Sequence, residues 1–216
     1  ALAYPESVES LVADGHEIGH HGWVHELLSP LDESEERAVI ERGIEALESV
    51  AGSRPIGFRA PGWDLSIRTV DLLVEYGFSY DSSMAGNDFS PYWCRSGDVA
   101  SADEAFVFGD QADLVEIPVS WHLDDVPFFE FVPGVANLTG LGRTEDVLDI
   151  WKTEFTYLAE NAGTGCMIVT MHPQSTGRGS RILLLRGFIE FVLDHGGAEF
   201  VRADTIAERF RVESPR

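Results

Sequence analysis

The chain has 216 residues, enough to bury a substantial core as one large domain or two small ones. Its 15 basic and 37 acidic side chains give a formal net charge of −22, with Lys152 as the single lysine. Because so acidic a chain repels phosphate backbones and anionic lipids, we predict neither a nucleic-acid partner nor a membrane partner.

A few features bear on the cellular compartment. No apolar run approaches membrane-spanning length, and no signal peptide is recognisable in the residues given. Together with the acidity, these features favour a cytoplasmic location. Cys94 and Cys166 lack a metal-type spacing, so buried or idle thiols are expected, with a disulfide as the alternative.

The first third of the chain alternates predicted helices and short strands. The predicted helices cover 5–13, 32–50 and 66–76, and the predicted strands cover 16–21, 56–59 and 78–81. Asp32 with Glu35 three residues later forms a capping box, and Gly52 follows the end of that helix. Ser66 is the predicted cap of the third helix.

The remainder continues the alternation around two irregular segments. Residues 82–113 are predicted to be irregular, and an irregular segment of that length is typical of a functional loop or of a loop that forms contacts in an oligomer. The other predicted segments are a strand at 114–120, an aromatic-rich loop at 127–133, helices at 144–161 and 182–193, strands at 167–171 and 199–201, and a last helix to about residue 211. We find no linker, so residues 1–216 are predicted to form a single α/β domain with a mostly parallel sheet, open or closed into a barrel.

Four of the seven histidines fall within residues 15–26. His21 and His25 are four residues apart, which lets two imidazoles approach one ion from the same side of a turn or helix. Imidazole suits zinc and similar transition metals, although such pairs also occur on ordinary solvated surfaces. A complete site would still need a third protein ligand and a water.

Several candidate residues come directly after predicted strands. In parallel α/β folds these strand ends meet on one face, where active sites are built, and this placement favours an enzyme. The residues so placed are His21, His25, Arg59, Trp121, Asp124, Asp125 and His172. Taken singly, Arg59 could form a surface ion pair, and His172 and Trp121 could belong to the core.

The motifs resemble those of the polysaccharide deacetylases, the NodB-type carbohydrate esterases. Residues 15–25 resemble the family's histidine motif, 58–62 its arginine-proline motif and 168–173 its late histidine motif. Residues 79–83 and 117–121, followed by Asp124 and Asp125, are similar to the branch with peptidoglycan-deacetylase-like and allantoinase-like members. The resemblance extends from about residue 5 to residue 210 in the family's order.

The resemblance implies a distorted (β/α) barrel and a divalent metal, usually zinc, held by an aspartate and two histidines. His21 and His25 map to the histidine ligands, His172 to the general acid, and Arg59 to the arginine that orients the catalytic aspartate. His20 is not expected to be a ligand. Pro61, Trp121, Asp124 and Asp125 are expected to bind substrate.

One departure concerns the family's Asp-Asp pair, because no residue before Asp14 matches it. We expect this pair, which includes the third metal ligand, and its strand to lie upstream of Ala1. Asp124 and Asp125 are the reserve candidates.

Three functions follow as hypotheses. The first is N-deacetylation of an acetylated amino sugar, such as peptidoglycan, and the second is ring opening of a cyclic amide or imide such as allantoin. The third is a non-catalytic member that lacks the acidic pair. In the first two, His172 protonates the departing nitrogen, so a carboxylate should lie beside it. The aromatics Phe128, Phe129 and Phe131 could line a substrate pocket or bury a contact in a homo-oligomer.

Overall fold

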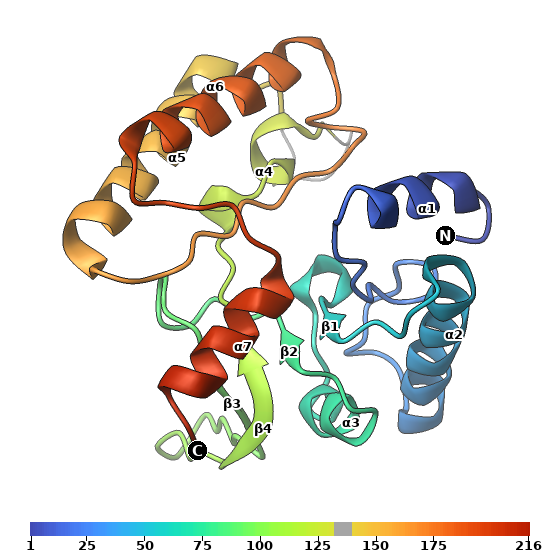
Figure 1. The fold of residues 1–216 in the computed structure, drawn as a ribbon. Coiled ribbons are helices and arrows are strands. Elements are labelled where there is room, and N and C mark those ends of the chain that lie inside the picture. Colours follow the sequence, from blue (N-terminus) through green and yellow to red (C-terminus); the bar gives the residue numbers. More distant parts are fainter. Residues whose placement is uncertain (132–139) are drawn as a thin grey trace. The chain divides into compact units, whose positions relative to one another are not determined.

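The computed structural model describes residues 1–131 and 140–216, which form two compact units (Figure 1). Unit 1 comprises Ala1–Met84, Pro91–Ile117 and Val201–Arg216, and unit 2 comprises Ala85–Ser90 and Pro118–Phe200. Among the described residues, no helix combines the length and apolar character needed to cross a membrane. The end of the predicted aromatic loop, from residue 132 on, lies outside the described residues.

Unit 1 contains the helices α1 (Pro5–Ala13), α2 (Glu33–Ala51), α3 (Thr69–Glu75) and α7 (Ala203–Glu213). The predicted capping box of α2 is confirmed: the Asp32 carboxylate accepts the Glu35 N–H, and the Glu35 carboxylate accepts the Asp32 N–H. Gly52 ends α2 in the left-handed region, with φ 73°. The helix α3 begins at Thr69, three residues after the predicted start at Ser66. The Ser66 hydroxyl accepts the Arg68 N–H at 3.0 Å and donates to Glu36.

A four-stranded mixed sheet lies in unit 1, in the order β1-β2-β4-β3. Its strands are β1 (Gly57–Phe58), β2 (Tyr80–Asp81), β3 (Tyr92–Ser96) and β4 (Asp110–Glu116). The β1–β2 and β2–β4 pairs are parallel, and β3 is antiparallel to β4. The predicted strand at 16–21 is reduced to a parallel bridge between His20 and Phe58. The predicted α/β class is confirmed, and closure into a barrel stays a prediction.

The strand β3 corrects the prediction that residues 82–113 are irregular. Its sequence, YWCRS, has a single fully buried side chain, Cys94, and so lacks a clear apolar alternation. Pairing with β4 stabilises it, partly through polar positions such as Ser96 opposite Asp110. For the same reason β4 begins at Asp110 and ends at Glu116, whereas the apolar pattern predicted 114–120.

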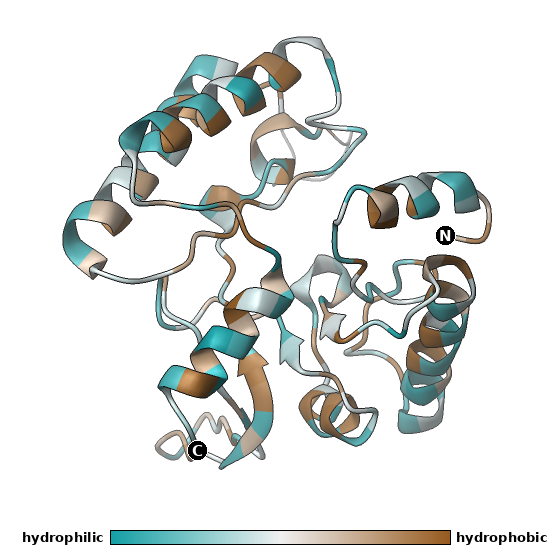
Figure 2. Cartoon of the chain, viewed as in Figure 1, coloured by the Kyte–Doolittle hydropathy of each residue, from teal (hydrophilic) through white to brown (hydrophobic). Residues whose placement is uncertain are grey.

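The core of unit 1 joins the sheet to α2 and α3. Val39, Ile40 and Ile44 supply the buried stripe of α2, as its helical period predicts. Figure 2 shows apolar residues on α3 and towards the end of β4. In contrast, α1 contributes no buried side chain.

Unit 2 is built around α5 (Thr144–Tyr157) and α6 (Gly179–His195). The helix α5 begins at the predicted residue but ends at Tyr157, four residues before the predicted end, whereas α6 extends beyond both ends of the predicted 182–193. Trp151 of α5 is fully buried and meets the Phe188 ring of α6 edge-on, with centroids 5.8 Å apart. Three shorter elements complete the unit: η2 (Trp121–Leu123), α4 (Val126–Phe129) and the π-helical turn η3 (Leu158–Ala162).

Two predicted strands and one predicted loop of unit 2 need correction. The segment 167–171 retains one parallel bridge, between Asp124 and Thr170. Residues 199–201 form no strand, because no described segment pairs with them in a ladder. The predicted loop at 127–133 begins as the helix α4, in which Phe129 packs into the core while Phe131 beyond it is exposed.

Candidate functional site

His21 and His25 lie together at the surface of unit 1, on the loop that follows the His20 bridge. Their ring centroids are 5.0 Å apart, and the ring planes are inclined at 80°. His21 Nδ1 lies 2.7 Å from the carbonyl oxygen of Arg59, which can only accept, so Nδ1 carries the proton. This contact leaves Nε2 of His21 as the nitrogen that can bind a metal.

Backbone contacts hold the loop that carries the two histidines. The Glu26 carboxylate accepts the N–H groups of Trp23 at 2.9 Å and Val24 at 2.8 Å. Gly22 has φ +71°, and a Cβ there would lie 2.9 Å from Cγ of the buried Pro61. His25 also has a positive φ, of 65°. Pro61, predicted to bind substrate, therefore packs against the loop.

His20 is buried beneath this loop, with 1% of its surface exposed. Burial lowers the pKa of its imidazole to about 4, so the ring is neutral at ordinary pH. Both ring nitrogens have partners inside unit 1, the Gly22 N–H and the Ile40 carbonyl. This arrangement agrees with the expectation that His20 is not a ligand.

Arg59 links the histidine loop to the end of β2. Its carbonyl accepts from His21, while its guanidinium donates through Nε to the Ser82 carbonyl at 2.8 Å and through a second nitrogen to the Ser82 hydroxyl at 2.7 Å. The partly buried side chain is thus fixed beside the sheet. Its predicted role, orienting a catalytic aspartate, stays a prediction.

Two buried carboxyl groups lie side by side at the ends of β2 and β4. Asp81 and Glu116 are register partners, and neither is exposed. Burial raises the pKa of Asp81, and burial together with the Asp81 charge raises the pKa of Glu116 well above its usual range. The sequence analysis missed this pair, although an acidic residue inside the apolar run Leu114–Ile117 was a visible signal.

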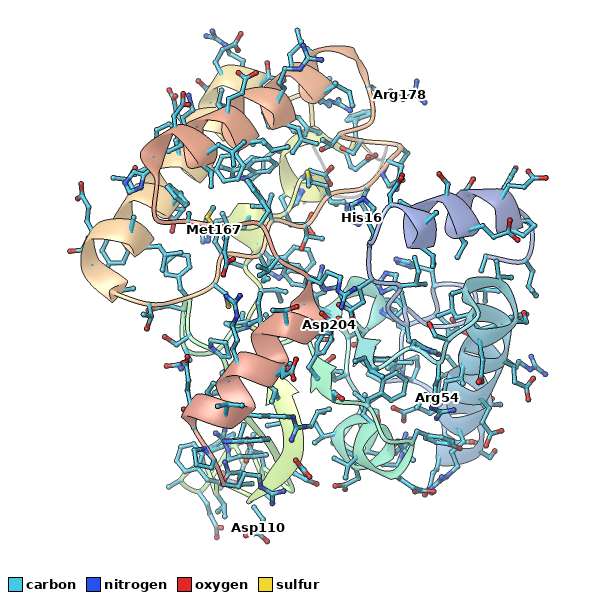
Figure 3. All side chains as sticks on the ribbon, in the orientation of Figure 1. His16, Arg54, Asp110, Met167, Arg178 and Asp204 are labelled. Atoms are coloured by element: carbon cyan, nitrogen blue, oxygen red, sulfur yellow. The ribbon has the colours of Figure 1, made fainter. Side chains whose placement is uncertain are left out.

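In unit 2, His172 is paired with the buried carboxylate of Asp125. Nδ1 of His172 lies 2.7 Å from Oδ1 of Asp125, which confirms the expected carboxylate neighbour. The other carboxylate oxygen accepts the backbone N–H of His172 at 3.0 Å and the hydroxyl of Thr176. His172 lies on the connection between η3 and α6, on which Met167 and Arg178 are labelled in Figure 3, whereas Asp125 directly precedes α4.

The Asp125 pairing fixes which atom of His172 can exchange a proton. With Nδ1–H directed at a carboxylate, Nε2 is the ring nitrogen that can exchange a proton with a reactant. The side chain of His172 is 27% exposed, so it can reach a reactant. This geometry supports an acid that protonates a leaving group.

Asp124 and Trp121, the other predicted substrate residues of unit 2, differ in exposure. Asp124 is buried and accepts the Val126 N–H at 2.7 Å, whereas 49% of Trp121 is exposed on η2. The potential ligand atoms of Asp124, Asp125 and His172 lie within 4.8 Å of one another, so this trio could hold a cation. In the structure Nδ1 of His172 is directed at Oδ1 of Asp125, which leaves Nε2 as the ring nitrogen that such a cation would use.

The sequence model of the family described as Polysaccharide deacetylase matches residues 1–80. The peptidoglycan deacetylase of Helicobacter pylori is 31% identical over 223 residues, covering 99% of this chain and 76% of that protein. A solved Mycobacterium smegmatis structure, described as a polysaccharide deacetylase, has a TM-score of 0.84 and 37% identity, covering 99% of this chain and 69% of its own. The structure of Puue allantoinase gives a TM-score of 0.80 and 26% identity, covering 100% of this chain and 66% of its own.

Proposed function

Because the chain belongs to the polysaccharide deacetylase family, we propose that it is a metal-dependent hydrolase that removes the acetyl group from an acetylated amino sugar, with peptidoglycan as the preferred candidate substrate. The observation that carries the proposal is the partly exposed His172 imidazole held by a buried carboxylate. Hydrolysis of an amide requires protonation of the departing nitrogen, and this pair is suited to that step.

The residues of unit 1 fit a zinc-class ion. His21 and His25 bring two imidazoles into contact, and the Arg59 carbonyl holds the proton of His21 on Nδ1, so that Nε2 carries the lone pair that would bind the ion. When bound, such an ion polarises the acetyl carbonyl and lowers the pKa of a bound water to about 7.

In unit 2, His172 and the residues that hold it would supply the proton that the leaving amine needs. Asp125 accepts Nδ1–H of His172 and so orients the ring, which directs Nε2 to donate a proton to the nitrogen of the sugar. Thr176 and the His172 backbone N–H hold the second carboxylate oxygen, which keeps Asp125 directed at the imidazole. The exposed indole of Trp121 offers an apolar surface for a sugar ring.

Acetate release from N-acetylated sugar oligomers and from peptidoglycan tests the proposal on zinc-loaded protein. We expect His21→Ala and His25→Ala to lose both zinc and activity. His172→Ala should keep zinc but lose about 10²–10⁴-fold in kcat, because a positioned acid typically contributes that factor. His16→Ala, which removes another exposed histidine, is the control. Unchanged kcat in His172→Ala would contradict the assigned acid.

Ring opening of a cyclic amide is the alternative function, and the match to Puue allantoinase over the whole chain favours keeping it. The same metal ligands and the same acid would serve this reaction. Parallel assays with acetylated sugar oligomers and with cyclic ureides and imides distinguish the two substrate classes. If zinc-loaded protein hydrolyses neither class of substrate, the result would instead support the third hypothesis, that the chain is a non-catalytic member of the family.

A further inference from the structure

The buried imidazole of His20 forms hydrogen bonds on both sides. Its Nδ1 lies 3.2 Å from the Gly22 N–H, which can only donate, so Nδ1 accepts. Nε2 must then carry the proton, and it donates to the Ile40 carbonyl of α2 at 3.1 Å. The ring also stacks on Phe58 at 5.1 Å and meets Phe78 edge-on at 5.7 Å. One side chain therefore ties the histidine loop to α2 and to the sheet.

A glycine in α2 makes room for this imidazole. A Cβ added at Gly43 would lie 2.0 Å from Nε2 of His20, so no larger residue fits there while the ring stays in place. Glycine inside a helix is ordinarily unfavourable compared with alanine. Here its presence in the middle of α2 is explained by the space that His20 occupies.

The backbone of His21 is held on both sides by this arrangement. His20 N–H donates to the Gly57 carbonyl at 2.8 Å, and the His20 carbonyl accepts the Arg59 N–H at 2.9 Å. On the other side of His21, the Gly22 N–H donates to the His20 ring, and the positive φ of Gly22 sets the direction in which the chain continues. The position of His21 thus depends on an acceptor at His20.

We infer that His20 is a positioning residue for the metal-binding pair, acting through the Gly22 N–H. The inference rests on the proposed metal site at His21 and His25. The required property is a hydrogen-bond acceptor two residues before Gly22, which an asparagine carbonyl can also supply in an Asx turn. Two substitutions therefore separate the acceptor from the packing. His20→Asn keeps a hydrogen-bond acceptor but fills less of the space of the imidazole ring. His20→Leu fills that space with an apolar side chain but has no acceptor.

Two measurements on the full chain test this inference. The first is hydrogen exchange of the Gly22 amide without metal, and the second is zinc affinity by competition with a chromogenic chelator. We expect His20→Leu to lose about tenfold protection at Gly22 and about tenfold zinc affinity. His20→Asn should stay near wild type in both, even if it melts at a lower temperature. The inference would be overturned if His20→Leu showed wild-type exchange at the Gly22 amide and wild-type zinc affinity. It would also be overturned if the zinc affinities of the variants only followed their melting temperatures.

A substitution in α2 provides an independent arm. Gly43→Ala should displace the ring and reproduce both effects of His20→Leu, although residue 43 does not touch the metal pair. Gly187→Ala in α6 is the matched control, because its Cβ would meet Leu148 at an ordinary 3.6 Å. If His21→Ala binds zinc like wild type, the proposed metal site fails, while the Gly22 exchange result still decides whether His20 fixes the loop.

Discussion

Replacing Glu116 by glutamine should make the protein more stable at neutral pH relative to wild type. The Glu116 carboxyl is fully buried, and its Oε1 accepts the N–H groups of Ser83 at 2.9 Å and Met84 at 2.8 Å. Among the described residues, Oδ2 of Asp81 has no hydrogen-bond partner. In Glu116→Gln, the amide oxygen can keep both backbone contacts while the NH₂ group donates to Asp81.

The magnitude follows from the raised pKa of Glu116. Folded protein keeps the Glu116 proton above the ordinary carboxyl pKa of about 4.3, whereas the unfolded chain releases it. The stabilisation of the protonated form is therefore complete below that pH and is lost as pH rises towards the folded pKa. In this window the free energy of unfolding falls by about 1.4 kcal/mol per pH unit for one proton. Glutamine does not titrate, so this contribution disappears in the variant.

Urea unfolding of wild type and Glu116→Gln at half-unit steps from pH 4.5 to 8 measures the effect. The difference in unfolding free energy should grow with pH in favour of the variant until the folded pKa is passed. Glu48→Gln, which removes the same charge from the exposed surface of α2, should run parallel to wild type. A Glu116→Gln profile parallel to wild type would show that Glu116 keeps no proton in the fold.

Three further predictions concern local geometry and the metal. Gly52→Ala should lower the free energy of unfolding by about 1 kcal/mol in urea titrations, because alanine disfavours the φ of 73° that ends α2. Gly57→Ala should cost about 1–3 kcal/mol by the same assay, because its Cβ would lie 2.0 Å from the Tyr80 ring; full stability would refute the close packing. Stripping the protein with a chelator should abolish acetate release and added zinc should restore it; full activity in the stripped protein would refute metal dependence.

Local signals in the sequence predicted the features that depend on neighbouring residues. The capping box and the terminal glycine located α2 within a residue at each end, because both act through contacts a few positions away. The spacing of His21 and His25 predicted two imidazoles on the same side of a turn, and their ring centroids lie 5.0 Å apart. The chemistry of His172 predicted a carboxylate neighbour, but not that Asp125, 47 residues away, would supply it.

Features that depend on tertiary strand pairing could not be predicted from the sequence patterns. The register of β2 against β4 places Asp81 opposite Glu116, and the sequence of neither strand alone determines that register. The strand β3 depends on its antiparallel partner in the same way. His20 could not be interpreted from its own motif, because its role depends on the space left by Gly43 in α2.

The left-handed backbone of His25 has a consequence for how this protein can change. A non-glycine residue at φ 65° costs about 1–2 kcal/mol relative to ordinary conformations. Glycine would relieve that strain but would remove an imidazole from the pair. Selection for a more stable fold and selection for the proposed metal site would therefore act in opposite directions at this one position.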